Sequence, residues 1–254
     1  MQVKDEKQYI ELADRPGIDH LYLLYGHGDS AHAFPSLYLW QDEMGLSLMA
    51  KREVYTARIR WKGENVWISP VGTETGKSRC IEELLESGLK SLCYLGEEDT
   101  VFLERSFPGV FEIRETPEDS EYIYDCRQMI EMPGKACEKI RNRYRRLEKE
   151  HRVTWRLLTP GTQAEAAEVT RQWTRSTDTG EGIEDTLAME RMWKKWQALE
   201  MQGVILSLDD VPWAVAAGYP LGNGDFDCFL LKAKENRPGV TDHLRAALAQ
   251  MAGV

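Results

Sequence analysis

Short apolar and aromatic segments, separated by turn residues, fill the first part of the chain, and this pattern is typical of β-strands. The Lys-Gly pair in the segment Trp61–Asn65 predicts a hairpin turn between two strands. After the loop-like segment Ser69–Ser78, apolar residues at helical spacing predict a helix that begins at Ser78 and runs through Leu89. The strands predicted in this part are Leu21–Tyr25, Leu37–Trp40, Leu46–Ala50, Tyr55–Trp61, Val66–Ser69, Val101–Leu103 and Val110–Ile113.

The pattern changes after an acidic segment with a proline, Glu115–Glu121, which is the best candidate for a domain boundary. A chain of 254 residues suits one large domain or two modest ones. We expect a first domain over residues 1–117 and a second over residues 118–254. In the second part we predict strands at Tyr122–Tyr124, Val204–Leu208, Trp213–Tyr219 and Asp227–Ala233, and helices at Gln163–Thr174, Leu187–Met201 (ended by Gly203) and Asp242–Met251.

Charge is distributed unevenly along the chain. The net charge is −10, which argues against general binding of nucleic acid. However, residues 135–152 hold eight basic residues against three glutamates. On a helix, Ile140, Tyr144 and Leu147 form one apolar stripe with cations on both flanks. Two interpretations stay open, a solvated helix surface and the wall of an anion-binding groove.

Several classes of protein are disfavoured. No apolar segment approaches the roughly 20 residues needed to span a bilayer, and the polar N-terminus lacks a signal-peptide pattern, so we expect a cytoplasmic protein without stable membrane attachment. The five cysteines form no CxxC pair, which favours free thiols. The five histidines show no metal-binding spacing, so we predict no metal site.

Five segments, taken in order, resemble one family: Leu37–Gly72, Phe107–Asp125, Gly134–His151, Arg171–Ser176 and Ala188–Gly203. This is the family built on the C-terminal domain of phosphatidylglycerol lysyltransferases, which is similar in fold to the Fem-type peptidoglycan transferases. The residues that match its motifs are Gly134, Lys139, Arg141, Asn142, Arg146, Trp173 and Glu190. The resemblance implies an α+β fold of two tandem GNAT-like (acyl-CoA N-acyltransferase-like) domains, each a mixed, mostly antiparallel sheet flanked by helices.

Relatives in this family move an aminoacyl group from aminoacyl-tRNA to an amine or hydroxyl, and the resemblance implies the same activity here. Lys139, Arg141, Asn142 and Arg146 would then hold an anionic acceptor or the acceptor end of the tRNA, and Lys232 and Arg237 would line the groove. Glu190 would orient or deprotonate the acceptor amine, unless it is only a capping or ion-paired helix residue. The expected partners are aminoacyl-tRNA or an anionic small molecule.

The sequence also departs from the family pattern. Glu138 replaces a histidine, and of a His/Glu-Lys pair on the third strand of the second domain only Lys232 remains. The chain stops at Val254, so we expect the second domain to be incomplete at its C-terminus.

The loop before the last helix bears on the cofactor. In GNAT-type folds this loop and the helix N-terminus bind the cofactor phosphates, but here only Gly239 fits the motif, and Pro238 removes a backbone donor. Acetyl-CoA is therefore a less favoured cofactor than aminoacyl-tRNA. Two alternative functions remain, an acyl-CoA-dependent N-acyltransferase and a non-catalytic protein that binds an anionic ligand.

Overall fold

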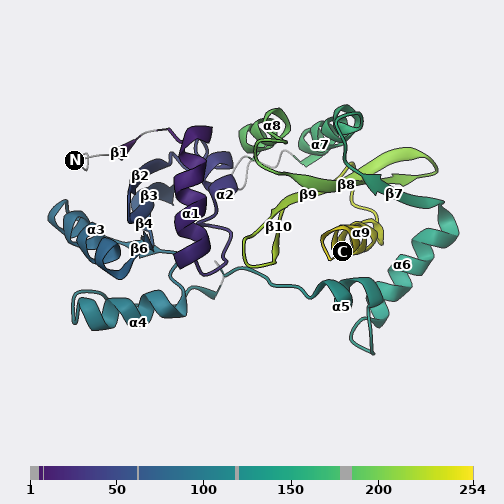
Figure 1. Cartoon of the computed structure of the whole chain (residues 1–254). Helices are drawn as coiled ribbons and strands as arrows, with labels where there is room; N and C mark the ends of the chain where they lie inside the picture. Colours follow the sequence, from purple (N-terminus) through teal and green to yellow (C-terminus); the bar gives the residue numbers. More distant parts are fainter. Residues whose placement is uncertain (1–5, 8, 62, 118–119, 178–184, 254) are drawn as a thin grey trace. The chain divides into compact units, whose positions relative to one another are not determined.

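The computed structural model describes residues 6–7, 9–61, 63–117, 120–177 and 185–253. It is an α+β fold with two sheets flanked by helices (Figure 1). The backbone contacts divide the chain into two compact units. Unit 1 comprises Met1–Glu121 with Leu221–Asp225, and unit 2 comprises Tyr122–Pro220 with Phe226–Val254.

Unit 1 is built on a mixed sheet with the order β1-β2-β3-β4-β6, in which β5 also pairs with β3. All pairs are antiparallel except β4 with β6. The hairpin predicted around Trp61–Asn65 is confirmed, and Gly63 in its turn has a φ of +84° that favours glycine. The strands are β1 (Glu6–Lys7), β2 (Ser47–Lys51), β3 (Val54–Trp61), β4 (Glu64–Ile68), β5 (Val71–Gly72) and β6 (Leu92–Cys93).

The first two segments predicted as strands are helices. Leu21–Tyr25 belongs to α1 (Arg15–Tyr25), which buries Ile18, Leu21 and Tyr22 at helical spacing. Leu37–Trp40 lies at the end of α2 (Phe34–Leu39), which is almost wholly buried. Each helix has a proline in its first turn, where the missing N–H costs nothing. A short apolar run does not distinguish a strand from a buried helix. Here both segments are helices whose apolar residues pack in the core.

The helix predicted from Ser78 begins earlier, at Glu74. In α3 (Glu74–Glu86), the Thr73 side chain caps the N-terminus by accepting a 3.0 Å hydrogen bond from the Gly76 N–H. Val101–Leu103 is also not a strand, because it lies in α4 (Glu97–Ser106) with Phe102 and Leu103 buried against α3.

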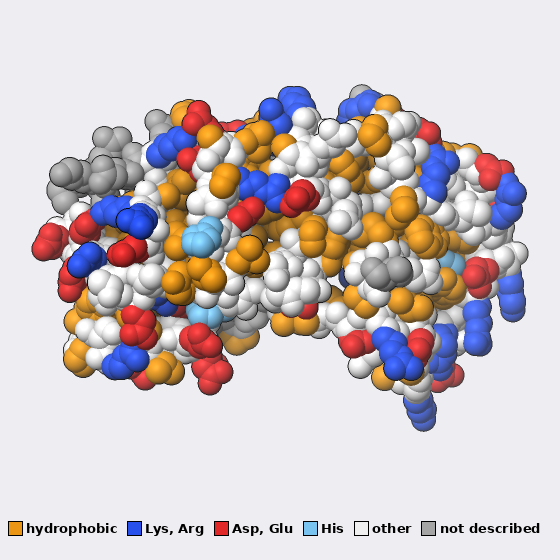
Figure 2. Space-filling view, viewed as in Figure 1, with side chains coloured by type: hydrophobic (Ala, Val, Ile, Leu, Met, Phe, Trp, Pro, Cys, Tyr) orange, Lys and Arg blue, Asp and Glu red, His pale blue; other side chains and the backbone are white. Residues whose placement is uncertain are grey.

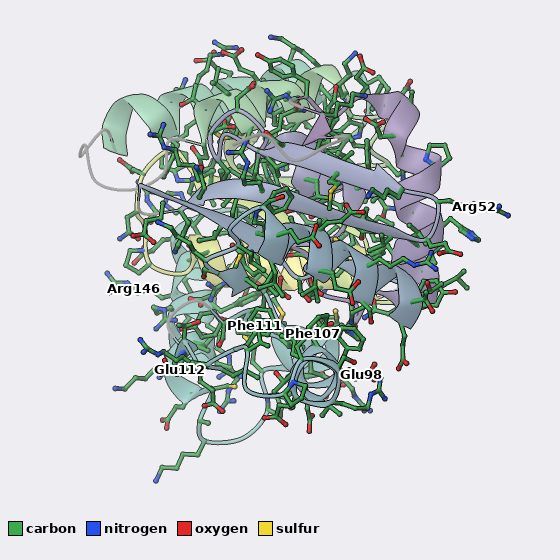
Figure 3. All side chains as sticks on the ribbon, turned by 90° about the vertical axis from the view of Figure 1, so that its left-hand side faces the viewer. Arg52, Glu98, Phe107, Phe111, Glu112 and Arg146 are labelled. Carbon is green, nitrogen blue, oxygen red and sulfur yellow. The ribbon has the colours of Figure 1, made fainter. Side chains whose placement is uncertain are left out.

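Val110–Ile113 has no regular structure. Its Phe111 instead meets Phe107 edge to face, with ring centroids 6.0 Å apart (Figure 3). Both rings pack on the apolar cluster that α3 and α4 form. These residues are therefore apolar because they contribute to the core, not because they form a strand.

Unit 2 is built on an antiparallel sheet with the order β10-β9-β8-β7. The predicted strands Val204–Leu208, Trp213–Tyr219 and Asp227–Ala233 are confirmed. Helix α9 covers one face of the sheet and α7 packs on β9 and β10 from the other (Figure 1). The elements are α5 (Cys126–Glu131), α6 (Glu138–Glu150), β7 (Val153–Leu157), α7 (Gln163–Thr177), α8 (Thr186–Lys194), β8 (Gln202–Leu208), β9 (Val211–Pro220), β10 (Phe226–Ala233) and α9 (Val240–Ala252).

The core between the sheet and α9 follows from strand alternation. Val204, Leu206 and Leu208 point to one face of β8 and pack against α9, together with Leu147 of α6. Helix α6 adds the Tyr144 ring, which stacks on His243 of α9. The basic segment is therefore a helix, as predicted, and it is anchored by the expected apolar stripe.

In unit 2 one predicted strand and the end of one predicted helix are wrong, and one strand was not predicted. Tyr122–Tyr124 is not a strand, and all three of its side chains are exposed. The helix expected over Leu187–Met201 ends at Lys194, and Gly203 lies in β8 instead of ending a helix. Strand β7 was not predicted, although its residues pair in register with all of Val204–Leu208.

Candidate functional site

The solvent-facing side of α6 gathers most of its positive charge. Leu147 is buried and Ile140 and Tyr144 are half-buried, so the opposite side of the helix faces water. At 100° per residue, that side carries Lys139, Asn142, Arg145, Arg146 and Lys149, all exposed, beside one exposed acidic residue, Glu138. We call these five residues the α6 basic face. Figure 2 shows Lys and Arg side chains along the part of the surface that α6 occupies.

Ion pairs leave most of this charge available. Arg146 is paired with Glu150 of the same helix at 2.8 Å, and its exposed side chain is labelled in Figure 3. Among the described residues, Lys139, Arg145 and Lys149 have no ion pair, and neither does the nearby Lys135. The α6 basic face is therefore a net positive surface in an otherwise acidic chain, which suits a polyanion.

Arg141 and Arg143 instead hold the structure together. Arg141 donates through Nη1 to the backbone oxygens of Met132 and Gly134, at 2.7 Å for the second, and so fixes the turn between α5 and α6. Arg143 forms a bidentate pair with Asp242 in the first turn of α9, at 2.8 and 3.0 Å. Of the residues predicted to bind an anion, Arg141 thus lies outside the α6 basic face, while Lys139, Asn142 and Arg146 lie on it.

Arg237 lies where the C-terminal end of α6 meets the loop before α9. Its Nη1 is 2.7 Å from His151 Nε2, its Nη2 donates to Glu235 at 3.1 Å, and its guanidinium lies 4.6 Å from the centroid of the Trp213 ring. The pKa of the nearby Glu150 is lowered by its hydrogen bond with Arg146 and further by the charge of Arg237. The fold therefore brings Arg237 and Arg146 to the same end of α6.

His151 is fixed on its other side by Asp209. Its Nδ1 lies 2.6 Å from Asp209 Oδ2, and the same carboxylate accepts the Arg152 N–H at 2.8 Å. The His151 bond, followed by the Arg152 N–H, lowers the pKa of Asp209. Asp209 and Asp210 both have positive φ in the tight turn between β8 and β9.

Gly239 is required by helix packing. It is the N-cap of α9 with a φ of +94°, and a Cβ atom added there would lie 2.6 Å from the backbone oxygen of Arg143. The α9 N-terminus therefore abuts α6. The Asp242 carboxylate in the first turn of α9 is paired with Arg143 of α6. This arrangement leaves little room for a cofactor pyrophosphate at Gly239.

Lys232 lies on the other face of the sheet. It shares a cross-strand row with Val215, Ile205 and Arg156, and the neighbouring row, which holds Val204, faces α9. The Lys232 ammonium lies 3.2 Å from the centroid of the Trp173 ring in α7 and 2.7 Å from the Asp185 carboxylate. The structure therefore separates Lys232 from the α6 basic face by the thickness of the sheet.

Glu190 lies on the exposed side of α8, where it pairs with Lys194 at 3.2 Å. This is the ion-paired arrangement that the sequence left open as an alternative to a catalytic role. The carboxylate is more than half exposed, so an acceptor amine can reach it.

Sequence reasoning missed His151, Asp209, Trp213 and Asp185 as parts of these clusters. A signal was present for Asp209, since the Asp209-Asp210 pair lies between the predicted strands Val204–Leu208 and Trp213–Tyr219. His151 follows the basic segment directly, but nothing local marks its partners, which lie 58 and 86 residues away along the chain.

The fold and these clusters define an α+β protein with a basic helix beside an antiparallel sheet. The sequence matches the family described as "Phosphatidylglycerol lysyltransferase, C-terminal" over residues 23–253. The chain therefore belongs to this family. No protein among the curated sequences matches the chain.

Two solved structures share the fold. A conserved protein of unknown function from Bacteroides thetaiotaomicron VPI-5482 has a TM-score of 0.85 at 19% identity, and the match covers 98% of this chain and 86% of that chain. The C-terminal domain of an Agrobacterium fabrum protein assigned as a lysylphosphatidylglycerol synthetase has a TM-score of 0.65 at 14% identity, covering 95% of this chain and 75% of that chain.

Family members are named for a reaction on a membrane lipid, so the relation of this chain to a bilayer matters. Among the residues that the structure describes, no helix combines the length and apolar composition needed to cross one.

Proposed function

We propose that this protein is an aminoacyltransferase that takes an aminoacyl group from aminoacyl-tRNA and transfers it to an amine or hydroxyl acceptor. The observation that carries the proposal is the α6 basic face, with Lys139, Arg145 and Lys149 exposed and without an ion pair among the described residues. A row of such cations suits the phosphates of a nucleic acid backbone, because each cation that neutralises a phosphate releases a condensed counterion. Family membership supports the choice of an aminoacyl donor over other polyanions.

The proposed reaction needs little covalent help from the protein. The acceptor nitrogen or oxygen attacks the ester carbonyl carbon, the bond from that carbon to the ribose oxygen breaks, and the acceptor proton passes to the leaving ribose hydroxyl. Positioning and stabilisation of the oxyanion supply most of the rate in such reactions.

Lys232 is our candidate for stabilising the oxyanion, because it places a cation on a rigid strand beside Trp173. Glu190 is the candidate for orienting or deprotonating the acceptor. The row of Lys232 and the α6 basic face lie on opposite faces of one sheet, so the tRNA would dock on one face and present its single-stranded acceptor end to the other.

We propose further that both units are GNAT-like. Each contains three consecutive antiparallel strands followed by a helix: β2, β3 and β4 before α3 in unit 1, and β8, β9 and β10 before α9 in unit 2. The short β5 lies between β4 and α3. This repeated order supports a tandem arrangement of the two units.

A second candidate function, non-catalytic binding of RNA or another polyanion, is favoured by the state of the two candidate catalytic groups. Lys232 is already paired with Asp185, and Glu190 is paired with Lys194. The acyl-CoA-dependent alternative is less favoured, because the α9 N-terminus packs against α6 at Gly239.

Binding experiments distinguish the three functions. We would titrate the purified chain with aminoacyl-tRNA, the same tRNA uncharged, and acetyl-CoA, each at two salt concentrations. The proposal predicts tighter binding of the charged tRNA, weakening with salt. Equal affinity for both tRNAs would favour the non-catalytic function, and binding of acetyl-CoA alone would revive the acyl-CoA-dependent function.

A further inference from the structure

Three side chains of unit 2 are joined by two hydrogen bonds that run in one direction: Arg237 donates to His151, and His151 donates to Asp209. The His151 Nδ1 lies 2.6 Å from Asp209 Oδ2, and the His151 Nε2 lies 2.7 Å from Arg237 Nη1. Asp209 comes from the β8–β9 turn, His151 from the end of α6 and Arg237 from the loop before α9. The two hydrogen bonds therefore link three elements that are distant in sequence.

The chemistry of Asp209 and Arg237 determines which ring nitrogen of His151 carries the proton. A carboxylate only accepts hydrogen bonds, so His151 donates from Nδ1 to Asp209. A guanidinium only donates, so the unprotonated Nε2 of His151 accepts from Arg237. This arrangement requires the neutral imidazole, because a second ring proton would point at the guanidinium.

Arg237 is oriented by more than this bond. Its guanidinium lies over the Trp213 ring and donates to Glu235, so three neighbours define its position. A guanidinium fixed in this way loses less conformational entropy when it binds an anion. The charged and titratable groups that face His151 from the elements around it are Glu150, Arg152, Asp209, Asp210, Glu235 and Arg237.

We propose that His151 is a positioning residue: its neutral ring holds Arg237 in place for a phosphate of the bound nucleic acid, and protonation of the ring releases Arg237. The choice of nucleic acid as the ligand rests on the proposed function. Protonated His151 would keep its bond to Asp209, so the ring would stay in place while Arg237 moved away. Affinity for the nucleic acid would then fall at acidic pH, where the ring gains its second proton.

The direction in which affinity changes with pH distinguishes a positioning role of His151 from a purely electrostatic one. Without positioning, an extra positive charge on His151 would strengthen the binding of any polyanion at low pH. With positioning, binding weakens, because the bond that directs Arg237 is lost.

The first test is tRNA affinity between pH 8 and pH 5.5 in the wild type, His151→Gln, His151→Ala and Arg237→Ala. Glutamine offers an acceptor oxygen that does not titrate. Relative to His151→Gln, we expect the wild type to lose about 5-fold in affinity over this range, in keeping with the net contribution of one ordinary hydrogen bond. His151→Ala and Arg237→Ala should bind about 5-fold more weakly than the wild type at pH 8. Wild-type affinity that rises as the pH falls would overturn the proposal.

The second test needs no ligand. NMR of the Arg237 guanidinium should show slow rotation of its N–H groups at pH 8, and averaging at pH 5.5 and in His151→Ala. Rotation that does not change with pH or with the variant would overturn the positioning role. If tRNA bound at no pH while the NMR signals behaved as expected, the proposed function would fail and the positioning of Arg237 by His151 would stand.

Discussion

Arg141 donates through its guanidinium to the backbone oxygen of Gly134 at 2.7 Å, and so closes the turn that leads into α6. Arg146, five residues further along the helix, is paired with Glu150 on the exposed surface. Both arginines match the family pattern, but the structure gives them different tasks. The first shapes the loop and the second faces solvent.

The first prediction separates these two arginines. Arg141→Ala should lower the free energy of unfolding by about 1–3 kcal/mol, because it leaves backbone oxygens without their charged donor. Arg146→Ala should leave the thermal midpoint unchanged but weaken tRNA binding. Thermal unfolding followed by circular dichroism, with tRNA binding on the same samples, checks both. Equal midpoints for the two variants would contradict the distinction.

The second prediction concerns Lys232. Lys232→Met keeps most of the side-chain volume next to Trp173 but removes the charge. If Lys232 stabilises the oxyanion, the rate of aminoacyl transfer should fall by roughly 10²- to 10³-fold, while tRNA affinity changes by less than about two-fold. Arg156→Met, at the other end of the same cross-strand row, is a matched control that should retain activity. Loss of tRNA binding in Lys232→Met would indicate a docking role instead.

The third prediction concerns Gly239. Gly239→Ala should destabilise unit 2 by at least about 1 kcal/mol, because the residue has a positive φ and the added Cβ would meet the Arg143 oxygen at 2.6 Å. Gly134→Ala, also in unit 2, shares the positive φ, and a Cβ added there would meet nothing within 4 Å, so it measures the backbone contribution alone. Midpoints that fall equally in the two variants would show that close helix packing at Gly239 adds nothing.

The fourth prediction concerns stability against pH in unit 1. Burial acts to raise the pKa of Asp29, but its hydrogen bond and charge interaction with His32 outweigh burial, so the pKa is lowered. The ring nitrogen of His32 lies 2.6 Å from the Asp29 carboxylate. A lowered folded-state pKa gives stability that is present above the unfolded value of about 3.9 and is lost as the pH falls through the folded value.

Asp29→Asn should therefore be less stable than the wild type at pH 7, and the difference should shrink as the pH falls below about 4. Denaturant midpoints at a series of pH values measure it. Glu86→Gln, which removes an exposed carboxylate elsewhere in unit 1, serves as the comparison. A stability difference for Asp29→Asn that does not vary with pH would show that the ion pair does not contribute.

Part of the fold could be predicted from the sequence because local patterns and packing agree there. The alternation on both sides of the Lys-Gly turn gave β3 and β4, and the apolar stripe of Ile140, Tyr144 and Leu147 gave α6. Where a short apolar run fits two structures, local pattern is insufficient. The segment Leu21–Tyr25 is the example, because only the position of Ile18 one turn earlier and the proline in the first turn mark it as a helix.

The candidate site was less predictable, because topology decides which side chains meet. The sequence identified Lys232 and the cations of α6, but only the register of β8, β9 and β10 shows that they lie on opposite faces of the sheet. Likewise, Arg141 and Arg145 look equivalent in a list of cations. Their difference depends on the positions of the Met132 and Gly134 carbonyls.

The central claim is that the α6 basic face binds the tRNA that carries the aminoacyl group. The most direct test is the salt dependence of aminoacyl-tRNA binding by the wild type and by the triple variant Lys139→Glu, Arg145→Glu and Lys149→Glu. Lys195→Glu, an exposed charge reversal just after α8, is the control. We predict that the triple variant binds at least about 10-fold more weakly and that its log–log salt slope is shallower by about 2 to 3, while the control binds like the wild type. An unchanged slope and affinity in the triple variant would contradict the claim.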